Sequence, residues 1–92
     1  MQVRVELTRR LAELAGFRST VVELQNGDTL GDALSNLVRR FSSVGANQLL
    51  ENGMLHPSIL VVVDGSARPK DQNALTLNGE ESIDLLLPIA GG

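Results

Sequence analysis

Hydrophobic and polar residues alternate at the start of the chain, which is the pattern of a strand with one buried face. Val3, Val5 and Leu7 fall on one side of this strand, with charged residues between them. Residues 8–16 (TRRLAELAG) then show helical spacing for one or two turns and stop at a glycine. Residues 19–25 (STVVELQ) are β-branched at their centre and predict a second strand, near enough to the first to form a hairpin.

The clearest helix is predicted over residues 29–41 (TLGDALSNLVRRF). Thr29 is placed to cap it, and Asp32 lies three residues later in a capping-box arrangement. Apolar residues at helical spacing form one stripe, which consists of Leu30, Ala33, Leu34, Leu37, Val38 and Phe41. Arg39 and Arg40 are expected in the last turn, where positive charge suits the helix dipole.

The second half of the chain predicts two more strands and two weaker elements. A continuous apolar run (ILVVVDG) predicts a buried strand closed by an Asp-Gly turn, although its pattern does not show which side chains face the core. The last strand is SIDLLLP, which Pro88 ends because proline cannot donate to a ladder. Gly45 is expected just beyond the main helix, and residues 46–53 as a short helical turn ending at Asn52-Gly53. Residues 67–77 are poorly patterned and leave room for a short edge strand or a helical turn.

This order of elements predicts an α+β protein with a mixed sheet of four or five strands packed on one main helix. Such a sheet and helix form two layers around one core, as a stable domain requires. Residues 1–92 are expected to form a single domain with the β-grasp fold, and small α+β sandwiches of other topology remain open at this point.

Composition excludes several classes of function. The chain has no cysteine and a single histidine, which removes disulfides and thiolate catalysis and leaves a zinc site without ligands. That histidine, His56, lies beside a proline and is expected to be an ordinary loop residue. A net charge of −3, isolated arginine pairs and only two aromatic residues predict that the protein does not bind nucleic acid. We therefore expect no bound cofactor and no metal.

Neither a membrane segment nor a catalytic centre is predicted. The longest apolar run, residues 59–63, is far too short to span a bilayer, and the first residues do not resemble a secretory signal. A cytoplasmic location without membrane contact is expected. The acidic residues of the second half lie in or beside turns without a paired base and are expected to be solvated; they are Asp64, Asp71, Glu80, Glu81 and Asp84.

The last strand is expected to present different residues on its two faces. Ile83, Leu85 and Leu87 alternate and should point toward the helix, whereas Leu86 should face outward. Leu60 or Val62 on a neighbouring strand could extend Leu86 into an apolar patch, and such patches mark partner surfaces. Partner contact and plain packing are both open for Leu86.

Beyond the last strand the chain has no patterned structure. The residues concerned are Pro88, Ile89, Ala90, Gly91 and Gly92. We expect them to project as a mobile tail, with the two glycines disordered in the absence of a partner. Because glycine lacks a Cβ, the end of this tail could enter a channel too narrow for any side chain and present the Gly92 carboxylate there.

Three stretches, NGDTLGDAL, ILVVVDG and SIDLLLPIAGG, together resemble the MoaD/ThiS sulfur carriers, which are ubiquitin-like. The resemblance covers nearly the whole chain. Pro88, Ala90, Gly91 and Gly92 match the ending typical of the molybdopterin synthase small subunit. The family often carries two aromatic residues and a second proline just before this ending, where this chain has leucines at 85–87.

The resemblance implies a carrier that holds sulfur on its own terminus and needs no catalytic residue. A ubiquitin-activating-like adenylyltransferase would use ATP to adenylate the carboxylate of Gly92. A sulfur donor would then convert the acyl adenylate into a thiocarboxylate. In molybdenum cofactor biosynthesis, the tail would finally enter the large subunit of molybdopterin synthase, with this chain as the small subunit.

Other interpretations remain open. The same thiocarboxylate could serve cysteine or thiamine biosynthesis through another sulfur-accepting enzyme. Gly92 could instead form an isopeptide bond with a target lysine, as in archaeal small modifiers. The domain could also be a non-covalent interaction module whose tail is incidental.

Overall fold

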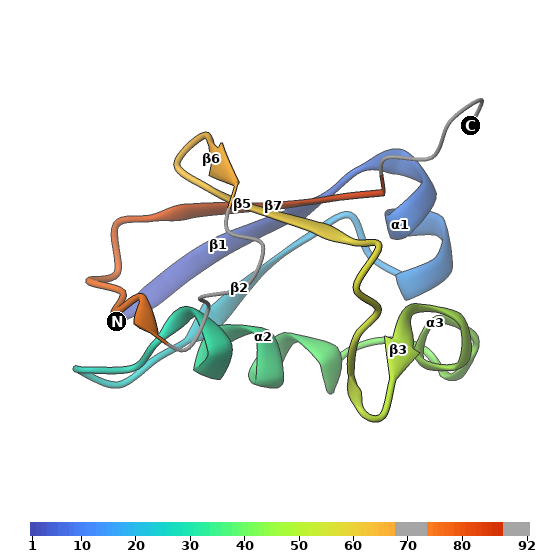
Figure 1. Cartoon of the computed structure of the whole chain (residues 1–92), viewed down its shortest axis with the longest axis horizontal. Helices are drawn as coiled ribbons and strands as arrows, with labels where there is room; N and C mark the ends of the chain where they lie inside the picture. The colour runs from blue at the N-terminus through green and yellow to red at the C-terminus, as the bar shows by residue number, and fades with distance from the viewer. Residues whose placement is uncertain (68–73, 88–92) are drawn as a thin grey trace.

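The computed structural model of the chain describes residues 1–67 and 74–87. The strands are β1 (Gln2–Leu7), β2 (Ser19–Glu23), β3 (Leu50–Glu51), β4 (Met54–Leu55), β5 (Leu60–Val63), β6 (Ser66–Ala67) and β7 (Ser82–Leu86). The helices are α1 (Arg9–Ala15), α2 (Leu30–Val38) and α3 (Ser43–Leu49). Five strands form one sheet in the order β2-β1-β7-β5-β6, and β3 pairs separately with β4 (Figure 1).

The main sheet is mixed, as predicted. β1 pairs antiparallel with β2 and parallel with β7, and β5 pairs antiparallel with both β7 and β6. The expected pairing of the two amino-terminal strands is therefore confirmed, with α1 lying between them in sequence. β7 lies at the centre of the sheet, so hydrogen-bonded neighbours hold it on both sides.

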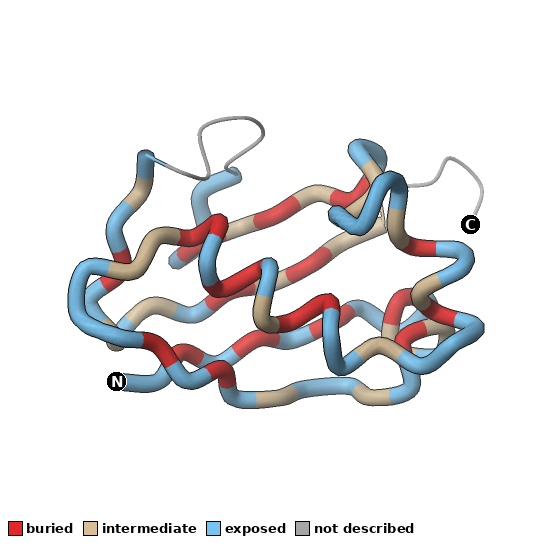
Figure 2. The backbone as a smooth tube through the Cα atoms, turned by 90° about the horizontal axis from the view of Figure 1, so that it is seen from below, coloured by how far each residue is buried: buried red, intermediate tan, exposed pale blue. Residues whose placement is uncertain are grey.

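Alternate residues of the central strands face the helices and are fully buried (Figure 2). Val5 lies opposite Ile83, and Leu85 lies opposite both Leu7 and Val61. The apolar stripe of α2 covers these side chains, so strand and helix residues together form the core. Burial of this apolar surface is the main force that holds the helix layer on the sheet.

The main helix begins as predicted and ends earlier than predicted. Thr29 and Asp32 form the capping box: the Thr29 Oγ1 accepts from the Asp32 N–H at 3.2 Å, and the Thr29 N–H donates to the Asp32 Oδ2 at 2.9 Å. α2 stops at Val38, because the next residues turn more tightly and the Phe41 N–H donates to the Val38 carbonyl three residues back. Phe41 instead lies beside Phe17, with ring centroids 5.9 Å apart.

The two arginines expected in the last turn of the helix have different roles. Arg39 is the C-cap residue, just past the last turn in which it was expected, and its Nε donates to the Ser35 carbonyl at 3.4 Å. For Arg40 the expectation was wrong. Its Nη1 donates to the Thr20 Oγ1 at 2.7 Å and to the Val21 carbonyl at 2.6 Å, which ties the segment after α2 to strand β2.

The helical turn predicted over residues 46–53 exists, but it lies earlier, as α3 (Ser43–Leu49), so its predicted end at Asn52-Gly53 and the position of Gly45 outside any helix were wrong. α3 begins earlier, because the Ser42 Oγ accepts from the Gly45 N–H at 3.1 Å and caps the first turn. Asn52 and Gly53 form the turn between β3 and β4, with φ angles of 55° and 80°. Such left-handed backbone is typical of tight hairpin turns, so this Asn-Gly pair reverses a strand instead of ending a helix.

Gly45 is the point of closest approach between α1 and α3. A Cβ atom at this position would lie 2.5 Å from the Leu14 carbonyl oxygen and 2.9 Å from the Ala15 Cα. The Ser42 N–H donates to the Ala15 carbonyl at 2.9 Å and the Ser42 Oγ donates to that of Leu14 at 3.1 Å, which fixes the two segments at this distance. The glycine therefore permits a helix–helix contact that any side chain would prevent.

The edge strand β6 (Ser66–Ala67) ends where the poorly patterned stretch over residues 67–77 begins, so it shares only Ala67 with that stretch. Residues 68–73 lie outside the described part of the chain. Beyond them, Leu77 is buried in the core, and its N–H donates to the Asp28 carbonyl at 2.9 Å. The sequence pattern did not predict this core residue, because the alternation over Leu75-Thr76-Leu77 is too short to identify a buried strand.

Candidate functional site

The candidate site lies where β7 ends and leads toward the predicted tail. The described structure extends to Leu87, one residue beyond this strand. The Thr8 N–H donates to the Leu85 carbonyl at 3.1 Å and adds a bond near the end of β7. The predicted tail residues are outside the described residues, so their role remains a prediction; they are Pro88, Ile89, Ala90, Gly91 and Gly92.

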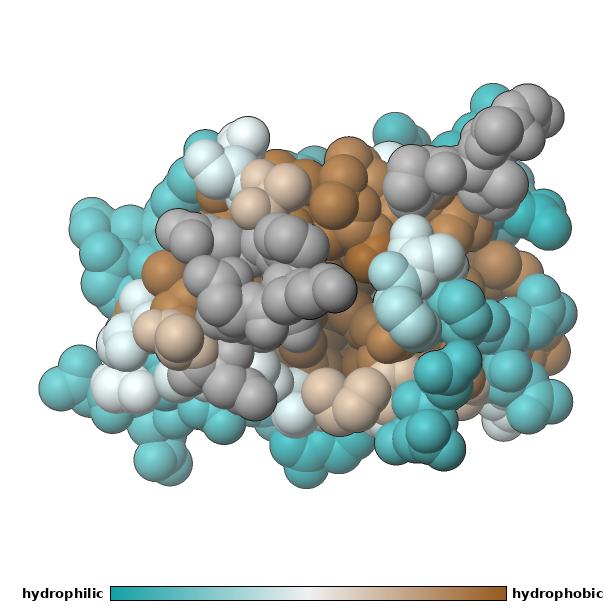
Figure 3. Space-filling view, viewed as in Figure 1, coloured by the Kyte–Doolittle hydropathy of each residue, from teal (hydrophilic) through white to brown (hydrophobic). Residues whose placement is uncertain are grey.

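An apolar patch occupies the sheet face opposite the helices, close to this end. It consists of Leu60, Val62 and Leu86, and we call it the outer patch. Leu60 lies directly opposite Leu86, and Val62 lies opposite Asp84, so the register places all of them on one face. Figure 3, which views the sheet from the side where β5 lies, shows hydrophobic residues gathered along β5. Leu86 is half-buried, less exposed than expected, because Leu60 lies beside it.

Charged residues border the outer patch on the side of β1. Glu6 lies beside the half-buried Asp84 in the parallel ladder. The Arg4 Nε donates to the Glu6 Oε1 at 3.0 Å, in an exposed ion pair. An apolar centre with a polar border is the usual anatomy of a protein–protein interface. The structure thus brings together the three residues singled out by the sequence, and their contact with a partner remains a prediction.

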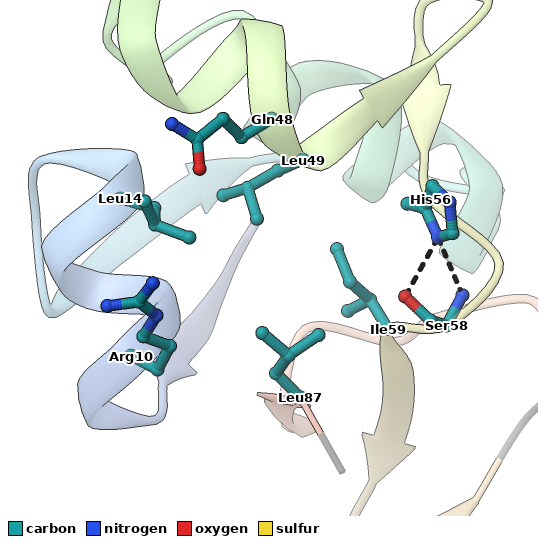
Figure 4. A pocket seen from close by; sticks show the side chains of 8 residues that line it. All are labelled: Arg10, Leu14, Gln48, Leu49, His56, Ser58, Ile59 and Leu87. Atoms are coloured by element: carbon teal, nitrogen blue, oxygen red, sulfur yellow. Dashed lines mark hydrogen bonds between the residues drawn. The ribbon is translucent and has the colours of Figure 1, made fainter. Parts of the chain in front are cut away.

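A hollow of about 260 Å³ lies on the helical side of the same end (Figure 4). Four apolar side chains from separate segments line it, namely Leu14 of α1, Leu49 of α3, Ile59 before β5 and Leu87 after β7. We call it the helical hollow. Sequence analysis missed it, because no local pattern shows that these four segments meet.

Polar side chains form the remaining wall of the helical hollow, with His56 and Ser58 on one side. The His56 Nδ1 accepts from the Ser58 N–H at 3.1 Å and lies 2.8 Å from the Ser58 Oγ. The His56 Nε2 lies 3.7 Å from the Glu51 Oε2. Because the Nδ1 already accepts the backbone N–H two residues on, we assign this contact to a local turn rather than to a nucleophilic centre.

The acidic residues expected to be solvated include two that hold turns. The Asp64 Oδ1 accepts from the first backbone N–H of β7 at 2.9 Å. Glu81 accepts from both backbone N–H groups of the turn at residues 78–79, at 2.9 to 3.0 Å. Glu80 is exposed, and Asp71 lies outside the described residues. Asp64 and Glu81 therefore stabilise loops, a role that the sequence analysis did not assign.

Two kinds of feature are absent from the described ranges, residues 1–67 and 74–87. Nowhere in them do three histidine or acidic side chains gather closely enough to hold a metal ion. None of their helices has the length and apolar character needed to cross a bilayer. What the described site offers is therefore an apolar patch on one side of the point where β7 ends and a hollow of mixed polar and apolar lining on the other.

Comparison with known proteins shows similarity over almost the whole chain. A family model described as the ThiS family matches residues 5–92. Small archaeal modifier protein 1 of Haloferax volcanii is 33% identical over 82 residues, which span 89% of this chain and 91% of the relative. The crystal structure of SAMP1 from Haloferax volcanii covers 100% of both chains with a TM-score of 0.80 and 27% identity.

A more distant likeness concerns the fold alone. The crystal structure of the Amycolatopsis orientalis BexX/CysO complex matches with a TM-score of 0.70 and 22% identity, covering 98% of this chain and 99% of the other. These matches, with the observed mixed sheet and helix layer, establish the predicted ubiquitin-like β-grasp fold.

Proposed function

The chain belongs to the ThiS family of ubiquitin-like sulfur carriers and modifiers, and from that premise we propose that it carries sulfur as a thiocarboxylate on Gly92. The observation that supports this most directly is the ending Pro-Ile-Ala-Gly-Gly, which follows the central strand β7 almost immediately. A rigid strand anchors the tail, and two terminal glycines give it a backbone thin enough for another enzyme's active site.

The proposed chemistry needs no side chain of this protein. A carboxylate oxygen of Gly92 attacks the α-phosphorus of ATP on the activating enzyme, and pyrophosphate leaves. Hydrosulfide delivered by a sulfur donor then attacks the acyl carbon, AMP leaves, and a thiocarboxylate remains without any change of oxidation state. A free carboxylate is a poor acyl donor, which is why the anhydride with AMP is required. The absence of cysteine fits this scheme, because the sulfur is held on the terminus.

We expect the activating enzyme to bind the outer patch while the tail lies in the active site of that enzyme. Its three aliphatic side chains are half-buried and bordered by charges, and they end within two residues of the tail. Contact there would hold the domain in one orientation and bring Gly92 within reach of the nucleotide. Binding far from the reacting atoms would in this way position them for the reaction.

For the sulfur acceptor, we propose the large subunit of molybdopterin synthase, with this chain as the small subunit in molybdenum cofactor biosynthesis. The match of Pro88, Ala90, Gly91 and Gly92 to that subunit's ending supports this choice. An acceptor in cysteine or thiamine biosynthesis would use the same thiocarboxylate. Incubation of the thiocarboxylate form with each purified acceptor, followed by product analysis, would decide between them.

Mass spectrometry of the intact protein tests the carrier chemistry. After incubation with the activating enzyme, ATP and a sulfur source, the protein should gain the mass of one oxygen-to-sulfur exchange, located at Gly92 by fragmentation. Deletion of Gly92 should abolish the gain, whereas Gln25→Ala, an exposed change in the turn between β2 and α2, should leave it intact. The proposal would be refuted if the wild-type protein kept its original mass and the reaction consumed no ATP.

A second candidate function is covalent modification of proteins. The 33% identity to a small archaeal modifier protein favours it. Gly92 would then join a target lysine through an isopeptide bond. Because Lys70 is the last basic residue of the chain, trypsin should leave residues 71–92 attached to each target lysine. Detection of that branched peptide in wild-type cells, and its loss on deletion of Gly92, would establish conjugation; its absence from cells that express the protein would exclude it.

A further inference from the structure

The helical hollow has no part in the proposed carrier chemistry, yet it adjoins the root of the tail. Leu87, the residue before the tail, forms one wall, and side chains of α1 and α3 form the opposite walls (Figure 4). The outer patch lies on the other face of the sheet, since Leu86 points away from the core side that Leu85 occupies. Two separate surfaces therefore flank the start of the tail.

The size and lining of the hollow suit a protein side chain. A volume of about 260 Å³ lies below the range of about 300–1,000 Å³ that is typical of small-molecule and cofactor sites. Leu49 and Ile59 lie almost fully buried in its floor, and polar groups make up more of its exposed lining than apolar groups do. Gln48 projects from α3 at its rim and is exposed. Such a hollow can bury one aliphatic or aromatic side chain, the kind of anchor that dominates protein interfaces.

The charged residues around the hollow indicate which kind of partner residue should lie next to the side chain that the hollow buries. Arg10 forms part of its wall and is exposed, and its Nη1 lies 3.9 Å from the Glu13 Oε1, beyond hydrogen-bonding distance. A second depression, between α1 and the segment before β2, is bordered by Arg9, Glu13 and Arg18. With Glu51 beside His56 included, three arginines and two glutamates lie around this end, so it is weakly positive, whereas the whole chain carries a net charge of −3. A carboxylate on the partner would complement it.

We propose that the helical hollow is a second docking point for the activating enzyme, which seats there an apolar side chain that is adjacent to a carboxylate. This inference rests on the proposed function, and it takes the activating enzyme as the partner because every pathway considered, including protein modification, begins with adenylation of Gly92. The enzyme contacts the outer patch on one face of the sheet and the helical hollow on the other. These two contacts fix the direction in which the chain leaves β7.

Filling the hollow is the first test. Gln48→Trp should place an indole over the floor and raise the KM for this protein in ATP–pyrophosphate exchange by about tenfold, with kcat little changed. Asn47→Trp is the matched control, because Asn47 is the exposed neighbour on the same helix and does not line the hollow. Equal KM values for the two variants, both folded with wild-type Tm, would overturn the proposal.

Reversing the charge is the second test. Arg10→Glu should raise KM by about threefold to tenfold at low salt, with the difference shrinking as salt screens the pair. Arg39→Glu makes the same change in net charge at an exposed site after α2 and should have little effect. An equal effect of the two variants would show a general response to net charge and would contradict a specific site at Arg10.

A titration that needs no enzyme separates this proposal from the carrier function. The 15N-labelled full chain is titrated with capped Asp-Leu-Asp, Lys-Leu-Lys and Asp-Ser-Asp peptides. Only Asp-Leu-Asp should shift the amides around the hollow, and Gln48→Trp should abolish the shift. If the wild-type protein is never adenylated, the proposed function fails, and this titration still decides whether the hollow binds. Identical responses to all three peptides, or none, would rule out the proposed recognition.

Discussion

Leu85 and Leu86 are the same residue type, one peptide bond apart, on opposite faces of β7. Leu85 is 1% exposed and lies opposite Leu7 and Val61 on the core side of the sheet. Leu86 is half-buried beside Leu60 on the outer face. Because strand side chains alternate, one strand can hold the core with one set of residues and offer a partner surface with the other.

This difference teaches that stability and partner contact are assigned to separate residues at this site. The inner face is covered by the helix layer, so a change there is felt by the whole fold. No described helix covers the outer face. The residues on that face can therefore change to suit a partner with little loss of fold stability. The predictions below test this separation by changing matched residues on each side.

The largest effect is expected for truncation of the inner leucine. Leu85→Ala should lower the free energy of unfolding by about 2–5 kcal/mol, because it removes buried methyl groups and leaves a cavity. Leu86→Ala should lower it by less than about 1 kcal/mol. Urea unfolding of both variants measures the difference, and similar losses would mean that the two faces contribute equally to stability.

A somewhat smaller effect is expected where the helix layer is held together. Gly45→Ala places a Cβ 2.5 Å from the Leu14 carbonyl oxygen, so α1 and α3 must move apart at a cost of about 1–3 kcal/mol. Asn47→Ala on the same helix is exposed and should be neutral or slightly stabilising. Thermal unfolding of the pair checks this, and an unchanged Tm for Gly45→Ala would contradict the close contact.

The capping box of α2 should have a moderate effect. Thr29→Ala removes the side-chain acceptor for the Asp32 N–H and should cost about 1 kcal/mol. Thr8 is the matched control: it occupies the N-cap of α1, and its side chain makes no capping hydrogen bond. Thr8→Ala should therefore cost only a few tenths of a kcal/mol. Equal losses in urea unfolding would show that the box adds nothing to stability.

The smallest effect on stability, and the clearest effect on function, is expected in the outer patch. Leu86→Ala should raise the KM for adenylation severalfold while the protein stays folded, since a docking contact is lost. Val21→Ala is the control, because Val21 is 41% exposed on the same sheet face but lies opposite Arg4 on the polar side. If both variants react like the wild type, the outer patch is not the docking surface.

The sequence predicted the fold well where local patterns are strong. Alternation identified β1 and β7, and the spacing from Leu30 to Val38 together with Thr29 and Asp32 identified α2 and its cap. It misplaced the bounds of α3, because Gly45 and the Asn52-Gly53 pair were interpreted as helix-ending signals. Glycine permits several backbone conformations and also close packing, so its role depends on what lies next to it in space.

For the candidate site, the sequence supplied the residues and the fold supplied their arrangement. Leu60, Val62 and Leu86 were named from the pattern, and the register of β5 against β7 placed them together. The helical hollow was not predictable, since its walls come from segments separated by up to 77 positions in the chain, from Arg10 to Leu87.

Alternation along a strand, helical spacing and a capping residue depend on neighbours only a few positions away, so the sequence by itself determined the main strands, the main helix and the glycine ending. The continuous apolar run of β5 has no such local bias. Only its pairing with β7 decided that Val61 and Val63 enter the core while Leu60 and Val62 face outward. The contact of α1 with α3 at Gly45 was likewise decided by packing, because close approach depends on how whole elements fit together.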